Sequence, residues 1–253
     1  MEPVPSSTAT PVPCGLGAGA PRRPPVWPLA RRMVEALFAA LAKLQRGRAF
    51  HRRGMAFEAT IRPAGAEATP QVLPVDGGIA LMRLSKGAGL PSWAPDVYGL
   101  ALRLPDAYGP DWHQDVLLST AAGDRPVLRH VLMPTRGADR RRYSSLLPYR
   151  HHDRLVLLGA RYAGPRRRTP LRIADLEHAM ATGGLTFDLA VAHLRGPWRT
   201  IARLTLQRRL PAAEARRLRF HPWNTSPQLP LAGPMSRLRA PAYEASHRAA
   251  TSE

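Results

Sequence analysis

Short segments in which apolar and polar residues alternate are the feature that most constrains this chain. Residues 57–61, 79–84 and 98–104 place apolar side chains at every second position, and clusters of Pro, Gly and Asp separate them. Alternation with period two is typical of strands that bury one face, and the clusters suit hairpin turns. The signal recurs at 115–119, 155–161, 185–193 and 198–207. The sequence therefore predicts seven or eight antiparallel strands.

Few helices accompany these strands. Met33, Leu37 and Leu41 recur at helical spacing and predict an amphipathic helix over residues 28–45, while the segments after Pro211 predict short helices. We expect an α+β fold, mainly β, built as a closed antiparallel β-barrel of about eight strands, with an N-terminal helix and short C-terminal helices. Strand patterning alone leaves a β-sandwich open as the alternative.

Composition divides the chain of 253 residues into a tail and one domain. Residues 1–25 are rich in Pro, Ser, Thr and Gly and predict a disordered tail, and residues 26–253 predict a single domain. No apolar run approaches the roughly 20 residues that a spanning helix needs, and the N-terminus lacks a signal-peptide pattern. We expect a cytoplasmic protein without a membrane span. The single cysteine, Cys14, excludes a disulfide scaffold and any cysteine-based metal site.

The formal net charge is +19, and every cationic residue except Lys43 and Lys86 is an arginine. Such a charge supplies weak, salt-sensitive affinity for polyanions. The arginines are scattered, with small clusters at 140–142 and 166–168, and no recognition-helix or RNA-binding aromatic pattern is present. A basic β-barrel that binds nucleic acid is therefore the non-enzyme alternative.

Three short motifs carry the candidate chemistry, each at the edge of a predicted element. Residues 48–54 contain Arg48, His51, Arg53 and Gly54, residues 83–85 contain Arg83 and Ser85, and residues 239–248 contain Arg239, Tyr243 and Arg248. Each motif alone matches many unrelated proteins by chance, whereas all three in this order are considerably more specific.

Together these motifs resemble the haem-dependent catalase family, in its compact short-chain branch. The family's R-x-x-H-x-K-G segment corresponds to residues 48–54, with Arg53 in place of the lysine, and its R-F-S segment corresponds to residues 83–85. Its D-x-x-G-F-A-V-K-F strand corresponds to residues 96–104, and its R-x-x-x-Y-x-D-T-x-R motif to residues 239–248. The resemblance runs from residue 27 to residue 250 and implies a haem b cofactor with ferric iron.

On one side of the haem, the resemblance implies that Tyr243 ligates the iron. A phenol has a pKa near 10, so a cation must favour its ionised form at neutral pH. The iron does most of this, and Arg239, four residues earlier on one helical face, assists it. The resemblance also places cations at the haem propionates, namely Arg48, Arg83 and Arg248.

On the other side of the haem, the resemblance implies that His51 moves a proton between the two peroxide oxygens and that Ser85 orients its ring. The family carries an asparagine on the fourth strand as a second distal hydrogen-bond donor. Counting along this chain reaches Ser119, with Thr120 next, so either a hydroxyl with a shorter reach takes the place of the amide or the chain has no such donor.

This replacement and the short chain favour a haem-dependent peroxidase of catalase type. It would cleave the O–O bond of organic hydroperoxides or hydrogen peroxide heterolytically and oxidise a small organic donor. Two haem alternatives remain open, a true hydrogen-peroxide catalase and a fatty-acid hydroperoxide isomerase or dehydratase that resembles allene oxide synthase. The expected partners are the peroxide and the donor, and the expected state is a monomer or homodimer.

Overall fold

The computed structural model describes residues 54–65, 72–87, 90–91, 93–222 and 224–232. All of them belong to one compact unit, residues 47–253. The predicted tail, the helix predicted over residues 28–45 and the helix predicted after residue 236 lie outside the described residues.

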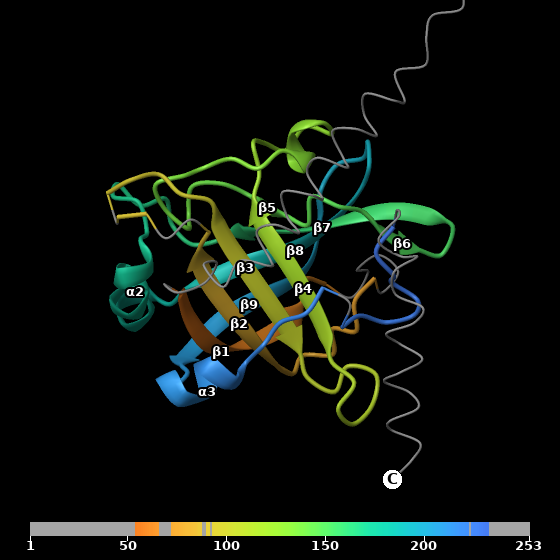
Figure 1. Ribbon diagram of the computed structural model, residues 1–253, viewed down its shortest axis with the longest axis horizontal. Coiled ribbons are helices and arrows are strands. Elements are labelled where there is room, and N and C mark those ends of the chain that lie inside the picture. The colour runs from red at the N-terminus through yellow and green to blue at the C-terminus, as the bar shows by residue number, and fades with distance from the viewer. Residues whose placement is uncertain (1–53, 66–71, 88–89, 92, 223, 233–253) are drawn as a thin grey trace, which may run out of the picture. The chain divides into compact units, whose positions relative to one another are not determined.

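Nine antiparallel strands make up the sheet, joined by short helical segments (Figure 1). The strands are β1 (Gly54–Pro63), β2 (Ile79–Lys86), β3 (Tyr98–Leu104), β4 (Gln114–Thr120), β5 (Tyr143–Ser144), β6 (Tyr149–His151), β7 (Arg154–Tyr162), β8 (Thr186–His193) and β9 (Arg199–Arg209). The helical segments are η1 (Leu128–His130), η2 (Ile173–Asp175), α2 (Leu176–Gly183) and α3 (Ala212–Arg217).

The sheet closes into a barrel through its shortest strand. The strands are hydrogen-bonded in the order β5-β4-β3-β2-β1-β9-β8-β7-β6, and β5 also pairs with β7. Eight strands therefore form a ring, and β6 extends beyond it as a hairpin with β7. This closure confirms the predicted barrel, and it removes the free sheet edges that a β-sandwich would leave.

Alternate residues of each strand fill the barrel interior. On β1 to β3 the inward side chains include Phe57, Met82, Leu84, Leu100 and Leu102, each at most 1% exposed. Directly paired residues of antiparallel strands point to the same face, so the cross-strand partners of these residues also point inward. The residues between them form the outer wall.

The observed strands follow the alternating segments, and the differences have local causes. β5, β6 and α2 were not predicted, because two or three residues are too short to show a period and α2 buries only Leu176 and Ala179. His152 and Asp153 form the β6–β7 turn and residues 105–113 form the β3–β4 hairpin, as predicted, whereas His151, also predicted in the loop, ends β6. Among the described residues, none of the helices has the length and hydropathy to cross a bilayer.

Gly159 on β7 is predicted to tolerate no side chain. A Cβ there would lie 2.7 Å from two ring carbons of Trp198 and 2.8 Å from the carbonyl oxygen of Tyr143. Because the carbonyl belongs to the backbone, Gly159→Val should lower the free energy of unfolding by about 1–3 kcal/mol. Urea denaturation measures this. Gly65→Ala is the matched control, since a Cβ at Gly65 meets nothing within 4 Å. An unchanged midpoint for Gly159→Val would contradict the packing described.

Candidate functional site

The outer wall of β1 to β4 carries a line of small residues. The strand register pairs Gly54 with Ser85, Ser85 with Gly99, and Gly99 with Ser119. We call these four residues the small-residue row. Since paired residues share a face, all four lie on the outside of the barrel. Gly54, Ser85 and Gly99 come from the segments 48–54, 83–85 and 96–104 that carry the resemblance. Ser119 is the serine predicted on the fourth strand.

The two glycines leave space for the side chain of Ser85. A Cβ at Gly54 would lie 2.9 Å from the Cβ of Ser85, and a Cβ at Gly99 would lie 3.2 Å from its Oγ. Ser85 is 2% exposed. Its hydroxyl is therefore held between two strands at positions where any larger neighbour would have to move, which explains both glycines of the motifs.

Arg83 lies next to the row on the same outer wall. It stands two residues before Ser85 on β2, and its cross-strand partners are Ala56 and Ala101. Burial lowers the pKa of its guanidinium below its usual value. The guanidinium-bearing residue Arg83 thus stands between two alanines, about 7 Å from Ser85 along the strand.

Ser119, and not Thr120, shares the face of Ser85. Thr120 points into the barrel, where it is fully buried. Its hydroxyl donates to the carbonyl oxygen of Met133 at 2.8 Å and accepts the backbone N–H of Tyr98 at 3.2 Å. The sequence left these two positions undecided, and the register decides which one belongs to the outer wall.

The remaining predicted site residues lie outside the described residues, namely Arg48, His51, Arg239, Tyr243 and Arg248. The structure thus brings together Arg83, Ser85 and Ser119 from the predicted set. Gly54 links this group to the first motif, because it both ends that motif and begins β1.

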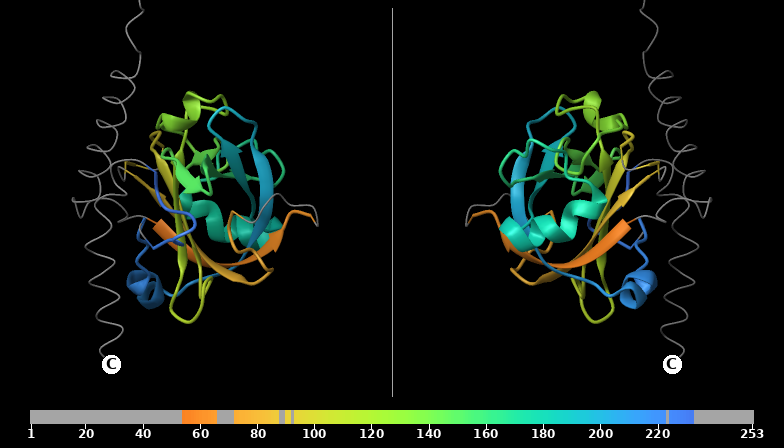
Figure 2. Two further views of the ribbon diagram at one scale, coloured as in Figure 1. Left: turned by 90° about the vertical axis from the view of Figure 1, so that its right-hand side faces the viewer. Right: turned by 90° about the vertical axis from the view of Figure 1, so that its left-hand side faces the viewer.

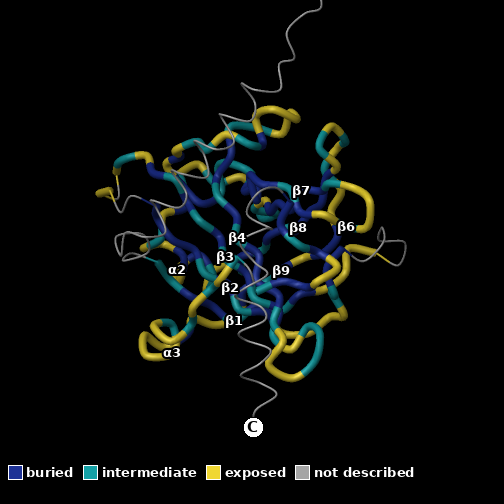
Figure 3. Tube along the Cα trace, turned by 45° about the vertical axis from the view of Figure 1, so that its right-hand side comes forward, coloured by how far each residue is buried: buried dark blue, intermediate teal, exposed yellow. Residues whose placement is uncertain are grey.

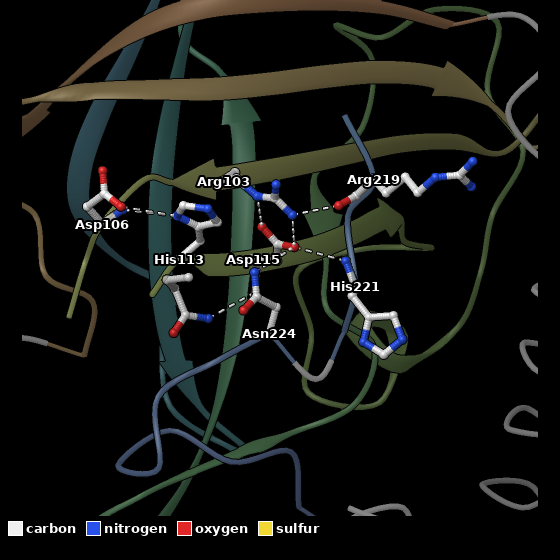
Figure 4. Close-up of polar contacts among 8 residues, drawn as sticks. Arg103, Asp106, His113, Asp115, Arg219, His221 and Asn224 are labelled. Atoms are coloured by element: carbon white, nitrogen blue, oxygen red, sulfur yellow. Dashed lines mark hydrogen bonds and ion pairs between the residues drawn. The ribbon is translucent and has the colours of Figure 1, made fainter. Parts of the chain in front are cut away.

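A buried ion pair forms a second cluster on the same wall (Figure 4). Arg103 on β3 donates from Nε and Nη2 to the two carboxylate oxygens of Asp115 on β4, both at 2.7 Å. The side chain of Asp115 is fully buried, and that of Arg103 is 16% exposed. Both stand four residues from the small-residue row along their strands, at Gly99 and Ser119. A two-point contact of this kind combines charge with fixed geometry.

The ion pair binds the segment that follows α3. Asp115 Oδ2 accepts the backbone N–H of His221 at 2.9 Å and the side-chain amide of Asn224 at 3.3 Å. Arg103 Nη2 donates to the carbonyl oxygen of Arg219 at 2.5 Å. We call the ion pair of Arg103 and Asp115 the clamp. It fixes Arg219, His221 and Asn224 against the outer wall, as Figure 4 shows. Sequence reasoning did not predict this clamp, because no local pattern relates its parts.

One exposed group of acidic and histidine residues lies apart from this wall, in the β3–β4 hairpin. Potential ligand atoms of Asp106, Asp111 and His113 lie within 4.8 Å of one another. The backbone N–H of Asp111 donates to Asp106 Oδ1 at 2.8 Å, and that of Asp106 donates to His113 Nδ1 at 3.1 Å. These contacts stabilise the hairpin, which is the role the sequence predicts for the segment.

Solved structures of catalases share this arrangement of strands. A fungal catalase superposes with a TM-score of 0.56 and 15% sequence identity, over 84% of this chain and 61% of that chain. Catalase A from Saccharomyces cerevisiae superposes with a TM-score of 0.55 and 14% sequence identity, over 92% of this chain and 66% of that chain. A bacterial catalase superposes with a TM-score of 0.54 and 14% sequence identity, over 85% of this chain and 60% of that chain.

These comparisons establish a catalase-type fold. The chain spans less than two thirds of the length of these catalases, at 61%, 66% and 60%. No family model matches the sequence. No curated protein matches it either. The outer wall of β1 to β4 is thus the candidate site, on a fold that catalases share.

Removal of the buried carboxylate is predicted to be costly. Asp115→Ala leaves Arg103 without its partner and the N–H of His221 without its acceptor. It should lower the free energy of unfolding by about 3–5 kcal/mol, measured by urea denaturation. Glu177→Ala is the control, because its ion pair with Arg209 is 47% and 43% exposed and should contribute about 0–1 kcal/mol. Equal losses in the two variants would contradict the importance of the clamp.

Proposed function

We propose that this chain is a haem-dependent peroxidase of catalase type that acts on organic hydroperoxides or hydrogen peroxide. The observation that carries the proposal is the small-residue row with Arg83 beside it. The residues of the row have small side chains or none, so they allow a flat group to lie against the outer wall. Arg83 beside them supplies a cation for an anionic propionate. The catalase-type fold supports the same conclusion.

The described residues fit the edge of a flat porphyrin in two respects. Gly54 and Gly99 present no side chain beside Ser85, so only a hydroxyl projects from this part of the wall. The pKa of Arg83 is lowered by burial, and an anion at this position would offset that cost. Arg83 would therefore hold a propionate, together with the proposed Arg48 and Arg248.

Chain reach supports the proposed role of His51. It precedes Gly54 by three residues, so its Cα lies within about 11 Å of the start of β1. Gly54 pairs directly with Ser85. Ser85 therefore lies on the strand next to the one that His51 precedes, which supports the role that the resemblance implies for its hydroxyl.

The clamp supports the proposed role of the C-terminal motif. It fixes Arg219, His221 and Asn224 on the same outer wall, four residues along β3 and β4 from Gly99 and Ser119. The chain that leads to Arg239 and Tyr243 therefore passes the wall that carries Ser85.

The described tyrosines show why a ligand tyrosine needs cations. Burial raises the pKa of Tyr98 to about 12 and raises that of Tyr143 as well. The hydroxyls of Tyr143 and Tyr108 donate hydrogen bonds to the carbonyl oxygen of Ala138 and the side chain of Gln114. Burial thus makes a phenol still harder to ionise, so the phenolate that the resemblance places at Tyr243 needs cations beside it, with Arg239 as one of them.

The proposed reaction converts a hydroperoxide and a reduced donor into an alcohol, water and an oxidised donor. Bound haem supplies the ferric iron whose change of oxidation state accompanies O–O cleavage. The imidazole of His51 accepts the proton from one peroxide oxygen and returns it to the departing oxygen, and Ser85 fixes the ring for both transfers. Ser119 offers a hydroxyl, with a shorter reach than an asparagine, which favours peroxidase over catalase action.

Haem binding is predicted to depend on Tyr243. The purified chain, given hemin, should show a Soret band, and Tyr243→Phe should weaken or abolish it because the anionic ligand is lost. Visible absorption titration with hemin measures this. Tyr162→Phe is the matched control on β7 and should keep the wild-type band. A wild-type protein that takes up no hemin would refute the proposed function.

Peroxide turnover is predicted to depend on His51 more than on Ser85. His51→Ala should retain the Soret band and lower turnover about 10²–10⁴-fold, because the group that moves the proton is gone. Ser85→Ala should lower turnover by about tenfold, since it only orients the ring. Stopped-flow assays with an organic hydroperoxide and a phenolic donor measure both, with His178→Ala on exposed α2 as the control. Unchanged peroxide kinetics in His51→Ala would reject its role.

A further inference from the structure

The loop that follows β4 exposes apolar side chains at one end of the barrel. Val127 is 73% exposed, Leu128 39% and Val131 37%. They lie within η1 or beside it. Three further arginines are exposed, one in this loop, one in the β8–β9 turn and one at the start of β9. We call the group the η1 surface, which comprises Val127, Leu128, Val131, Arg125, Arg195 and Arg199.

A buried arginine holds the two loops together. Arg129 within η1 donates to the carbonyl oxygens of His193 at 3.1 Å and Gly196 at 3.0 Å, both in the β8–β9 turn. Its guanidinium lies 4.9 Å from the ring centre of Trp198. Both loops lie at the same end of the barrel in every view (Figure 2). The exposed valines and leucine are therefore held on an ordered support.

The charge of this surface is almost entirely positive. Residues 121–136 and 193–199 contain one acidic residue, Asp124. Asp124 is already paired with Arg142, at 2.7 Å. The segments exposed at this end stand out from the buried strands behind them (Figure 3). An ordered cluster that combines exposed aliphatic side chains with unbalanced arginines is complementary to a surface that is both apolar and anionic.

We propose that the η1 surface docks on anionic phospholipid membranes. Val127, Leu128 and Val131 enter the interfacial region of the bilayer, and the arginines contact lipid phosphates. Nucleic acid matches this surface less well, because an aliphatic cluster offers phosphates no contact and bases no aromatic ring on which to stack. This inference does not depend on haem binding.

Vesicle flotation of the full-length protein tests the proposal. The probes are vesicles of phosphatidylcholine alone and of phosphatidylcholine mixed with phosphatidylglycerol. The wild-type chain should bind the anionic vesicles selectively. The double variant Val127→Ser/Leu128→Ser should lower the partition coefficient about tenfold through lost apolar burial. The double variant Arg195→Gln/Arg199→Gln should lower it by at least about tenfold through lost charge.

Matched controls locate the effect. Ile79→Ser removes another exposed aliphatic side chain, which is 58% exposed, and Arg216→Gln/Arg217→Gln removes two charges from α3. Both should bind like the wild type within about twofold. Failure of the wild type to bind anionic vesicles overturns the proposal. So does wild-type binding by Val127→Ser/Leu128→Ser, because general positive charge then accounts for the interaction. Equal losses in the variants and their controls also refute the site.

Discussion

The pairing register of β1 to β4 is the constraint on which the candidate site depends. Successive side chains of a strand point to opposite faces, so a slip of one residue on β2 would turn Ser85 into the barrel and Leu84 outward. The inward positions hold fully buried apolar residues such as Met82 and Leu102, and a slip would expose them. The hydrophobic core therefore enforces the alignment of Gly54, Ser85 and Gly99, and barrel closure through β5 prevents the sheet from relaxing at an edge.

The clamp extends this control to the C-terminal part of the chain. A fully buried carboxylate is expensive to desolvate, and Asp115 offsets the cost with two contacts from Arg103 and further bonds from His221 and Asn224. Few placements of Arg219, His221 and Asn224 satisfy all of these contacts together. The clamp on β3 and β4 lies on the same outer wall as Ser85 on β2.

The arginines that give the chain its formal net charge of +19 occupy different environments, some inside the fold and some on its surface. Arg103 is committed to an ion pair with Asp115, and Arg129 to backbone carbonyl oxygens and the face of Trp198. These arginines maintain the fold. Arg83 stands on the outer wall beside the small-residue row, whereas Arg195 and Arg199 are exposed beside apolar residues of η1. Arginine count alone distinguishes none of these environments.

The sequence by itself predicted the strands with clear alternation, favoured a barrel over a sandwich, and by resemblance proposed Arg83 and Ser85 as site residues. It left Ser119 and Thr120 undecided, and it predicted neither the short strand β5 nor the clamp. Only the tertiary structure decided these, because alternation and motifs are local, whereas register and closure join distant residues. Arg103 and Arg219, which contact each other, are 116 residues apart. The roles proposed for His51 and Tyr243 stay predictions. Their motifs are local, but the contacts that would make them a site join opposite ends of the chain.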